Sequence, residues 1–152
     1  MTQSVRSHTG PAALIKLAQD VLNTEIAGLA AVRDRLNART PEKAPLVLAL
    51  GLLAACTGRV VVTGIGKSGL VGRKLAATFS STGTPAFFLH PVEGAHGDLG
   101  SLRKDDVIIA ISNSGETAEL NAILPALKSL GTSLIAMTGR EDSTLGRLAD
   151  VT

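Results

Sequence analysis

Two short segments, both rich in glycine and in hydrogen-bond donors, could bind an anion. Residues 64–69 read Gly-Ile-Gly-Lys-Ser-Gly, and residues 112–117 read Ser-Asn-Ser-Gly-Glu-Thr. Glycines let backbone N–H groups approach an anion closely, and lysine and hydroxyl side chains add further donors. The second segment therefore predicts a hydroxyl-rich site for a phosphate monoester, to which the first segment would add Lys67 and Ser68.

The first segment also invites two nucleotide-binding interpretations, and both fit poorly. Its three glycines match a dinucleotide fingerprint, but that motif needs an acidic residue about 20 positions further on, at the tip of the second strand. Here the next acid, Glu93, follows Pro91. A Walker loop needs a glycine where this sequence has Val61. A dinucleotide-dependent oxidoreductase is therefore disfavoured.

The second segment supplies candidate proton-transfer groups. Glu116 and Glu119 are three residues apart on the helix predicted to leave this loop, so one carboxylate could lie near a ligand held at the helix start. Such a carboxylate could abstract a proton next to a carbonyl group. Both features also have purely structural interpretations. An acidic residue in the first turn stabilises a helix through its dipole, and Ser112 or Ser114 could simply be the N-cap of the helix.

A third segment, residues 90–99, contains two histidines and two acids. His90, Glu93, His96 and Asp98 could resemble a metal site, but the glycines and the proline between them give no helical spacing for shared ligation. We therefore expect no metal here. A loop histidine that orients a substrate or moves protons is favoured instead. Arg140 and Glu141, after a later strand, are interpreted as solvated surface residues.

The elements that must position these segments alternate between strand and helix. Short apolar runs at 60–63, 86–89, 107–111 and 133–137 predict buried parallel strands, and a helix is expected at 68–81 and after residue 115. The sequence predicts a doubly wound three-layer α/β/α fold. The expected strand order is 2-1-3-4-5, with a fifth strand cut short at residue 152. This order brings both glycine-rich loops to one edge of the sheet.

Two helices are expected before the first strand. One begins at Pro11, carries its apolar residues mostly on one face and ends at residues 39–41, and residues 1–10 before it are expected to be loose. The other, residues 46–56, is apolar nearly all round. A helix of that kind is buried, either inside a domain or in a subunit interface.

Composition excludes several classes of protein. A length of 152 residues fits one domain, and the single Cys56 excludes a disulfide scaffold. Three Phe, with no Trp or Tyr, disfavour a base-stacking single-strand binder, and a net charge of +2 without long basic runs disfavours duplex binding. Because no apolar run approaches the ~20 residues of a membrane span, we expect a cytoplasmic protein with no nucleic-acid or membrane partner.

Three sequence stretches together carry a family resemblance. GIGKSGLVGRK, HPVEGAHGDLG and ISNSGETAE occur in this order from residue 64. They resemble the sugar-isomerase (SIS) domain, and within it the D-arabinose-5-phosphate isomerases. The resemblance covers residues 11–152 and implies interconversion of arabinose 5-phosphate and ribulose 5-phosphate through an enediol or enediolate. The product feeds synthesis of the sugar Kdo for lipopolysaccharide or capsule.

The resemblance also implies roles for individual residues. It gives catalytic roles to Lys67, Glu119 and His96, and phosphate-binding roles to Ser68, Ser112, Ser114 and Thr117. It implies no cofactor, a phosphorylated sugar as substrate, and a homotetramer with shared active sites. Family members continue past the position of Thr152 and many carry CBS domains, so we expect a C-terminally incomplete SIS domain without CBS domains, lacking part of the active site.

Two alternatives to this assignment stay open. One is a non-catalytic sugar-phosphate sensor, because SIS domains also serve in transcription regulators. The sequence contains no helix-turn-helix segment before the domain, which disfavours that interpretation. The other is an SIS isomerase that acts on a different phosphosugar, such as a hexose or heptose phosphate.

Overall fold

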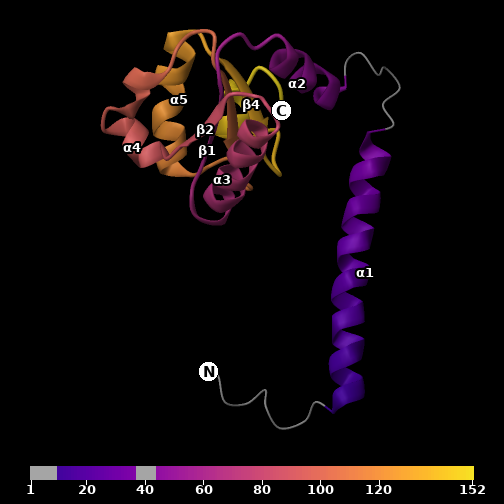
Figure 1. The fold of residues 1–152 in the computed structure, drawn as a ribbon. Coiled ribbons are helices and arrows are strands. Elements are labelled where there is room, and N and C mark those ends of the chain that lie inside the picture. Colours follow the sequence, from indigo (N-terminus) through magenta and orange to yellow (C-terminus); the bar gives the residue numbers. More distant parts are fainter. Residues whose placement is uncertain (1–9, 37–43) are drawn as a thin grey trace. The chain divides into compact units, whose positions relative to one another are not determined.

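A computed structural model describes residues 10–36 and 44–152, and the chain divides into two units, residues 1–44 and 45–152 (Figure 1). Helix α1 (Pro11–Arg35) is the element described in the first unit. Pro11 stands in its first turn, as predicted, and Leu36 is its C-cap. The predicted stop at residues 39–41 and residues 1–9 of the predicted loose segment 1–10 lie outside the described residues, and Gly10 is the N-cap of α1.

The second unit contains a parallel sheet whose strands match the predicted runs. The strands are β1 (Val60–Gly64), β2 (Ala86–Leu89), β3 (Val107–Ile111) and β4 (Ser133–Met137). All three pairings are parallel and the order is β2-β1-β3-β4. The predicted order is therefore confirmed for these strands, and β1 lies next to β3, where the strand order reverses.

Of the predicted fifth strand, a single residue pairs with β4. Val151 forms a single parallel bridge with Ile135 of β4, and the Ala136 N–H donates to the Val151 carbonyl at 2.8 Å. Asp150 anchors this contact, since its carboxylate accepts from Lys128 Nζ at 2.6 Å and from the Leu134 N–H at 2.7 Å. The described sheet therefore has four strands, not five, because the pairing beyond β4 is limited to the single bridge at Val151.

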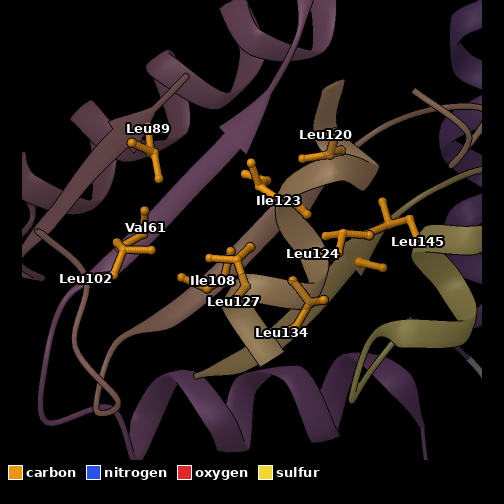
Figure 2. Packing of buried hydrophobic residues seen from close by; sticks show 12 residues of the cluster. Val61, Leu89, Leu102, Ile108, Leu120, Ile123, Leu124, Leu127, Leu134 and Leu145 are labelled. Atoms are coloured by element: carbon orange, nitrogen blue, oxygen red, sulfur yellow. The ribbon is translucent and has the colours of Figure 1, made fainter. Parts of the chain in front are cut away.

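Helices cover both faces of the sheet, which confirms the three-layer prediction. On one face, α5 (Ala118–Leu130) and α6 (Thr144–Leu148) bury their leucines against alternate residues of β1, β3 and β4 (Figure 2). On the other face, α2 (Pro45–Ala54) and α3 (Gly66–Ser81) pack over the remaining strand positions. Each fully buried leucine of α5 and α6 contributes about 1.5–3 kcal/mol, so this layer stabilises the domain strongly.

Helix α2 is only half buried in this chain. Ala49, Leu52 and Leu53 pack against the sheet, as a buried helix requires. Its opposite side is exposed, with Leu46 at 47% and Leu50 at 54% of full exposure. Burial inside the domain is therefore confirmed for one side of the helix, and burial of the other side in a subunit interface stays a prediction. Within the part of the chain that the structure describes, no helix is both long and apolar enough to cross a bilayer.

A buried carboxylate closes the end of the sheet opposite to the glycine-rich loops. Asp106, 1% exposed, accepts from the backbone N–H of Arg59 at 2.8 Å and from that of Arg103 at 2.9 Å. The Arg59 guanidinium adds a 3.3 Å ion pair and lies 4.7 Å from the ring centre of Phe87. The Asp106 side chain thus joins the start of β1 to the start of β3. It holds in register the two strands whose opposite ends lead into the glycine-rich loops.

Replacing Asp106 by alanine is expected to lower the free energy of unfolding by about 3 kcal/mol, because two part-buried N–H groups lose their acceptor and the ion pair with Arg59 is lost. The neighbouring Asp105 is exposed and serves as the control, because Asp105→Ala removes the same charge without freeing a buried donor. Urea denaturation of both variants measures the difference. Equal stability of the two variants would contradict this structural role.

Candidate functional site

The two glycine-rich loops emerge side by side at the carboxyl ends of β1 and β3. Gly64, the last residue of β1, pairs with Ile111, the last residue of β3. A Cβ at Gly64 would lie 2.9 Å from the Ile111 carbonyl oxygen, so the two backbones approach as closely as glycine permits. Ligands of open α/β sheets bind at this kind of edge, beside a reversal of strand order. The predicted meeting of the two loops is confirmed.

The glycines of the first loop bring α3 close to the sheet. A Cβ at Gly69 would lie 2.8 Å from the Gly64 carbonyl oxygen, and Gly66 has a φ of 59° that favours glycine. Helix α3 starts at Gly66 rather than at the predicted Ser68. Lys67 and Ser68 therefore lie in the first turn of a helix, beside its N–H groups.

The helices that follow β1 and β3 begin without a side-chain cap. Within the described residues, Ile65 and Thr117 are the N-caps of α3 and α5, and neither side chain accepts a hydrogen bond from its helix. The short helices α4 (Pro91–Ala95) and α6 differ, because His90 and Ser143 cap them. The first-turn N–H groups of α3 and α5, with the partial positive charge of each helix end, are thus open to an anion.

The hydroxyl groups of the second loop stabilise the loop itself. Ser112, 3% exposed, accepts from the Gly115 N–H at 3.1 Å, and its Oγ lies 2.9 Å from Oγ1 of Thr117. Ser114 accepts from the Glu116 N–H at 3.2 Å. The alternative that Ser112 or Ser114 is an ordinary cap of α5 is therefore wrong. These contacts shape the loop and leave the start of α5 uncapped.

A cavity of about 450 Å³ opens beside both loops. Its lining comprises Ser68, Ile111, Asn113, Ala136, Met137, Thr138 and Gly139. Of the seven predicted site residues, Ser68 lines this cavity, and the other six, all of them described, lie outside its lining. Asn113, Thr138 and Gly139 were missed, although Asn113 lies inside the predicted loop and the other two directly follow the fourth predicted strand.

The two glutamates of the second loop have different surroundings. Glu116 precedes α5 instead of lying on it, and its carboxylate accepts from the Thr144 N–H at 2.8 Å. That hydrogen bond lowers the pKa of Glu116, and the charges of Arg147 and Arg140 lower it further. Glu119 lies in the first turn of α5, exposed, and makes no side-chain hydrogen bond or ion pair within residues 10–36 and 44–152. Among the described residues Glu119 therefore has no polar partner, in contrast to Glu116.

Residues 90–99 form more regular structure than their glycines and proline suggest. They fold into α4 and the 3-10 helix η2 (Asp98–Ser101), with His90 Nδ1 accepting from the Val92 N–H at 3.3 Å. Proline suits the first turn of a helix, which the prediction of an irregular loop overlooked. His96 is the exposed C-cap of α4. Over the described ranges, no three His, Cys, Asp or Glu side chains gather as a metal site.

The fold and the site together define a doubly wound α/β domain of the kind that binds anionic ligands at the edge where strand order reverses. A family model described as the SIS domain matches residues 53–152, and the chain belongs to this family.

Relatives and solved structures support this membership. The chain is 62% identical over 96 residues to the arabinose 5-phosphate isomerase KdsD of Escherichia coli K12, and 51% identical over 133 residues to KdsD of Salmonella typhi. These matches cover 63% and 88% of this chain, but 29% and 39% of the relatives' own lengths. The chain thus spans about two fifths of the curated relatives it matches.

A solved structure is similar over most of the chain. It is described as E. coli CFT073 c3406 in complex with arabinose 5-phosphate, and it is 46% identical with a TM-score of 0.81. The similarity covers 93% of this chain and 72% of that protein.

Proposed function

We propose that this chain binds a five-carbon sugar phosphate and belongs to an aldose–ketose isomerase that interconverts D-arabinose 5-phosphate and D-ribulose 5-phosphate. The observation that carries the proposal is the pair of helices without side-chain caps, α3 and α5, whose preceding loops lie side by side at the strand-order reversal, next to a cavity lined by Ser68 and Asn113. The arabinose 5-phosphate complex of the 46% identical structure supports the same ligand class.

The phosphate would bind at the second loop. First-turn N–H groups of α5 and the Ser114 hydroxyl offer donors to its oxygens, and Ser68 offers another from α3. The hydroxyls of Ser112 and Thr117 share one hydrogen bond, which leaves one of their two O–H groups for the phosphate. Binding energy at the phosphate would then hold C1 and C2 of the sugar in place, far from the anchoring group.

The chemistry would proceed through an enediol or enediolate. Glu119, whose carboxylate has no partner among the described residues, would move the proton between C1 and C2. The ammonium group of Lys67 would stabilise the negative charge that develops on oxygen. His96 would assist ring opening or proton transfer between oxygens. No step requires a cofactor.

The setting of this activity is a further part of the proposal. The KdsD name of the relatives supports a role in Kdo and lipopolysaccharide synthesis, which would place the enzyme in the cytoplasm. The exposed apolar side of α2 supports assembly, and we propose a homotetramer with shared active sites.

An assay on arabinose 5-phosphate tests the function directly. Formation of ribulose 5-phosphate is followed with this chain, with other pentose, hexose and heptose phosphates in parallel, and the melting temperature is measured with each sugar. Because the chain is expected to lack part of the active site, we expect arabinose 5-phosphate to raise the melting temperature, and turnover to be slow and confined to this sugar.

Two other outcomes of this assay are informative. Stabilisation by arabinose 5-phosphate without turnover would support a phosphosugar-binding domain that lacks catalytic groups, or a sensor. Neither turnover nor stabilisation would contradict the assignment.

A further inference from the structure

The phosphate-binding loop proposed above is joined to the segment that follows β4. The Gly139 N–H donates to the Asn113 carbonyl at 3.0 Å, and the Leu145 N–H donates to the Gly115 carbonyl at 3.1 Å. A Cβ at Gly115 would overlap the side chain of Ser143, so the two segments are in direct contact there. The conformation of residues 112–117 therefore depends on residues 139–145.

One side chain adds a charged contact to this junction. The Glu116 carboxylate accepts from the Thr144 N–H at 2.8 Å through Oε1, and Oε2 lies 3.5 Å from Asn121 Nδ2. Asn121 in turn donates to the Gly115 carbonyl at 3.2 Å. Thr144 is the first residue of α6, so the carboxylate also meets the positive end of that helix. Glu116 thus links the loop, α5 and α6.

A carboxylate beside a phosphate site has a cost, because two anions repel each other. Glu116 is exposed, so an uncharged side chain at position 116 would lose no buried packing. The hydrogen bond from the Thr144 N–H lowers the pKa of Glu116, and the charges of Arg147 and Arg140 lower it further. A carboxylate so engaged is a poor proton acceptor for the substrate, which separates its role from that of Glu119.

We propose that Glu116 is a positioning residue: its carboxylate holds the 112–117 loop against the start of α6 and so sets the geometry of the phosphate-binding groups. This inference rests on the proposed function, because it assigns the same loop to phosphate. Misplacing bound groups by about an ångström is enough to weaken a site strongly.

Inorganic phosphate is the first probe, since it reports on the anchoring site without any catalytic step. Glu116→Ala is expected to weaken phosphate binding about tenfold by calorimetry, because the loop loses its anchor. Glu116→Gln keeps an oxygen that can accept from the Thr144 N–H, and it is expected to restore affinity to within about threefold of the wild-type chain. Glu141→Ala is the matched control, because it removes an exposed glutamate from the neighbouring segment.

Amide hydrogen exchange provides a readout of the junction itself. In Glu116→Ala the N–H of Leu145 should exchange at least about tenfold faster, while Ile109 in β3 should keep its protection. The retained protection of β3 would show that the variant is folded. If the Leu145 N–H exchanges in Glu116→Ala at the same rate as in the wild-type chain, the proposal is overturned.

A backbone variant tests the same contact from the other side. Thr144→Pro removes the N–H group that donates to the Glu116 carboxylate. Proline is tolerated here, because position 144 is the first residue of α6 and the ψ of 167° at Ser143 suits a following proline. The expected loss of phosphate affinity matches that of Glu116→Ala, and the double variant should be no weaker than either alone.

The outcomes separate this inference from the proposed function. If the losses of phosphate affinity from the two single variants add up in the double variant, the positioning role is overturned and the proposed function is left intact. Equal phosphate affinity of Glu116→Ala and the wild-type chain would have the same meaning. A wild-type chain that binds neither phosphate nor arabinose 5-phosphate would overturn both. Loss of affinity in Glu116→Gln as large as in Glu116→Ala would assign the effect to charge instead of anchoring, and would also overturn it.

Discussion

Replacing Lys67 by alanine is expected to lower kcat for arabinose 5-phosphate isomerisation by about 10²–10³-fold, the usual cost of removing one group that stabilises a developing oxyanion. Lys67 lies in the first turn of α3, next to Ser68, which lines the cavity. Its ammonium group is exposed and makes no ion pair within the described part of the chain. The fold should be unaffected, because no packing depends on this side chain.

A second measurement makes the Lys67 prediction independent of turnover. A hydroxamate that mimics the enediolate should lose affinity in Lys67→Ala far more than inorganic phosphate does, since an interaction specific to the transition state is lost. Lys74→Ala, an exposed lysine on the same helix, is the control. Undiminished turnover together with unchanged hydroxamate affinity would remove Lys67 from the mechanism.

Replacing Gly115 by alanine is expected to abolish phosphate binding and to destabilise the domain. Gly115 has a φ of 65°, which costs an alanine about 1 kcal/mol. The new Cβ would also overlap the Ser143 side chain and lie 3.0 Å from Thr138 Oγ1. Relieving this overlap must separate the loop from the start of α6, for a total loss of about 2–4 kcal/mol. Affinity for phosphate should fall by more than about 100-fold.

Gly131→Ala isolates the backbone part of the Gly115 effect. Gly131 ends α5 with a φ of 77°, and a Cβ there would have no atom within 4 Å among the described residues. It should therefore cost about 1 kcal/mol and leave phosphate binding unchanged. Thermal melts and phosphate titrations of both variants measure the comparison. Equal losses of stability and intact binding in both would contradict the packing of Gly115 against Ser143.

The layers of this fold could be predicted from the sequence because each strand is a continuous apolar run. Residues 107–111 have no polar position, which only a strand covered on both faces tolerates, and the structure places helices on both faces. Helix signals were equally local. Gly131 ends α5 and Ser143 caps α6, and both residue types favour those positions.

Predictions failed where a local pattern allows two outcomes. Residues 91–95 contain a proline and a glycine and were interpreted as loop, yet α4 forms there with His90 as its cap. Helix α2 is apolar all round, and periodicity could not say which side meets the sheet. Only the packing of Ala49, Leu52 and Leu53 decided that.

The sequence by itself determined the four strands and the two glycine-rich loops that follow β1 and β3, because these follow from the hydrophobic pattern and the glycines. Only the tertiary structure distinguished Glu116, bonded to Thr144, from Glu119, whose carboxylate is available. Only it placed Asn113 and Thr138 in the wall of the cavity. The reason is physical: these contacts join residues about 25–28 positions apart, and the chain brings them together only once β3 and β4 are paired.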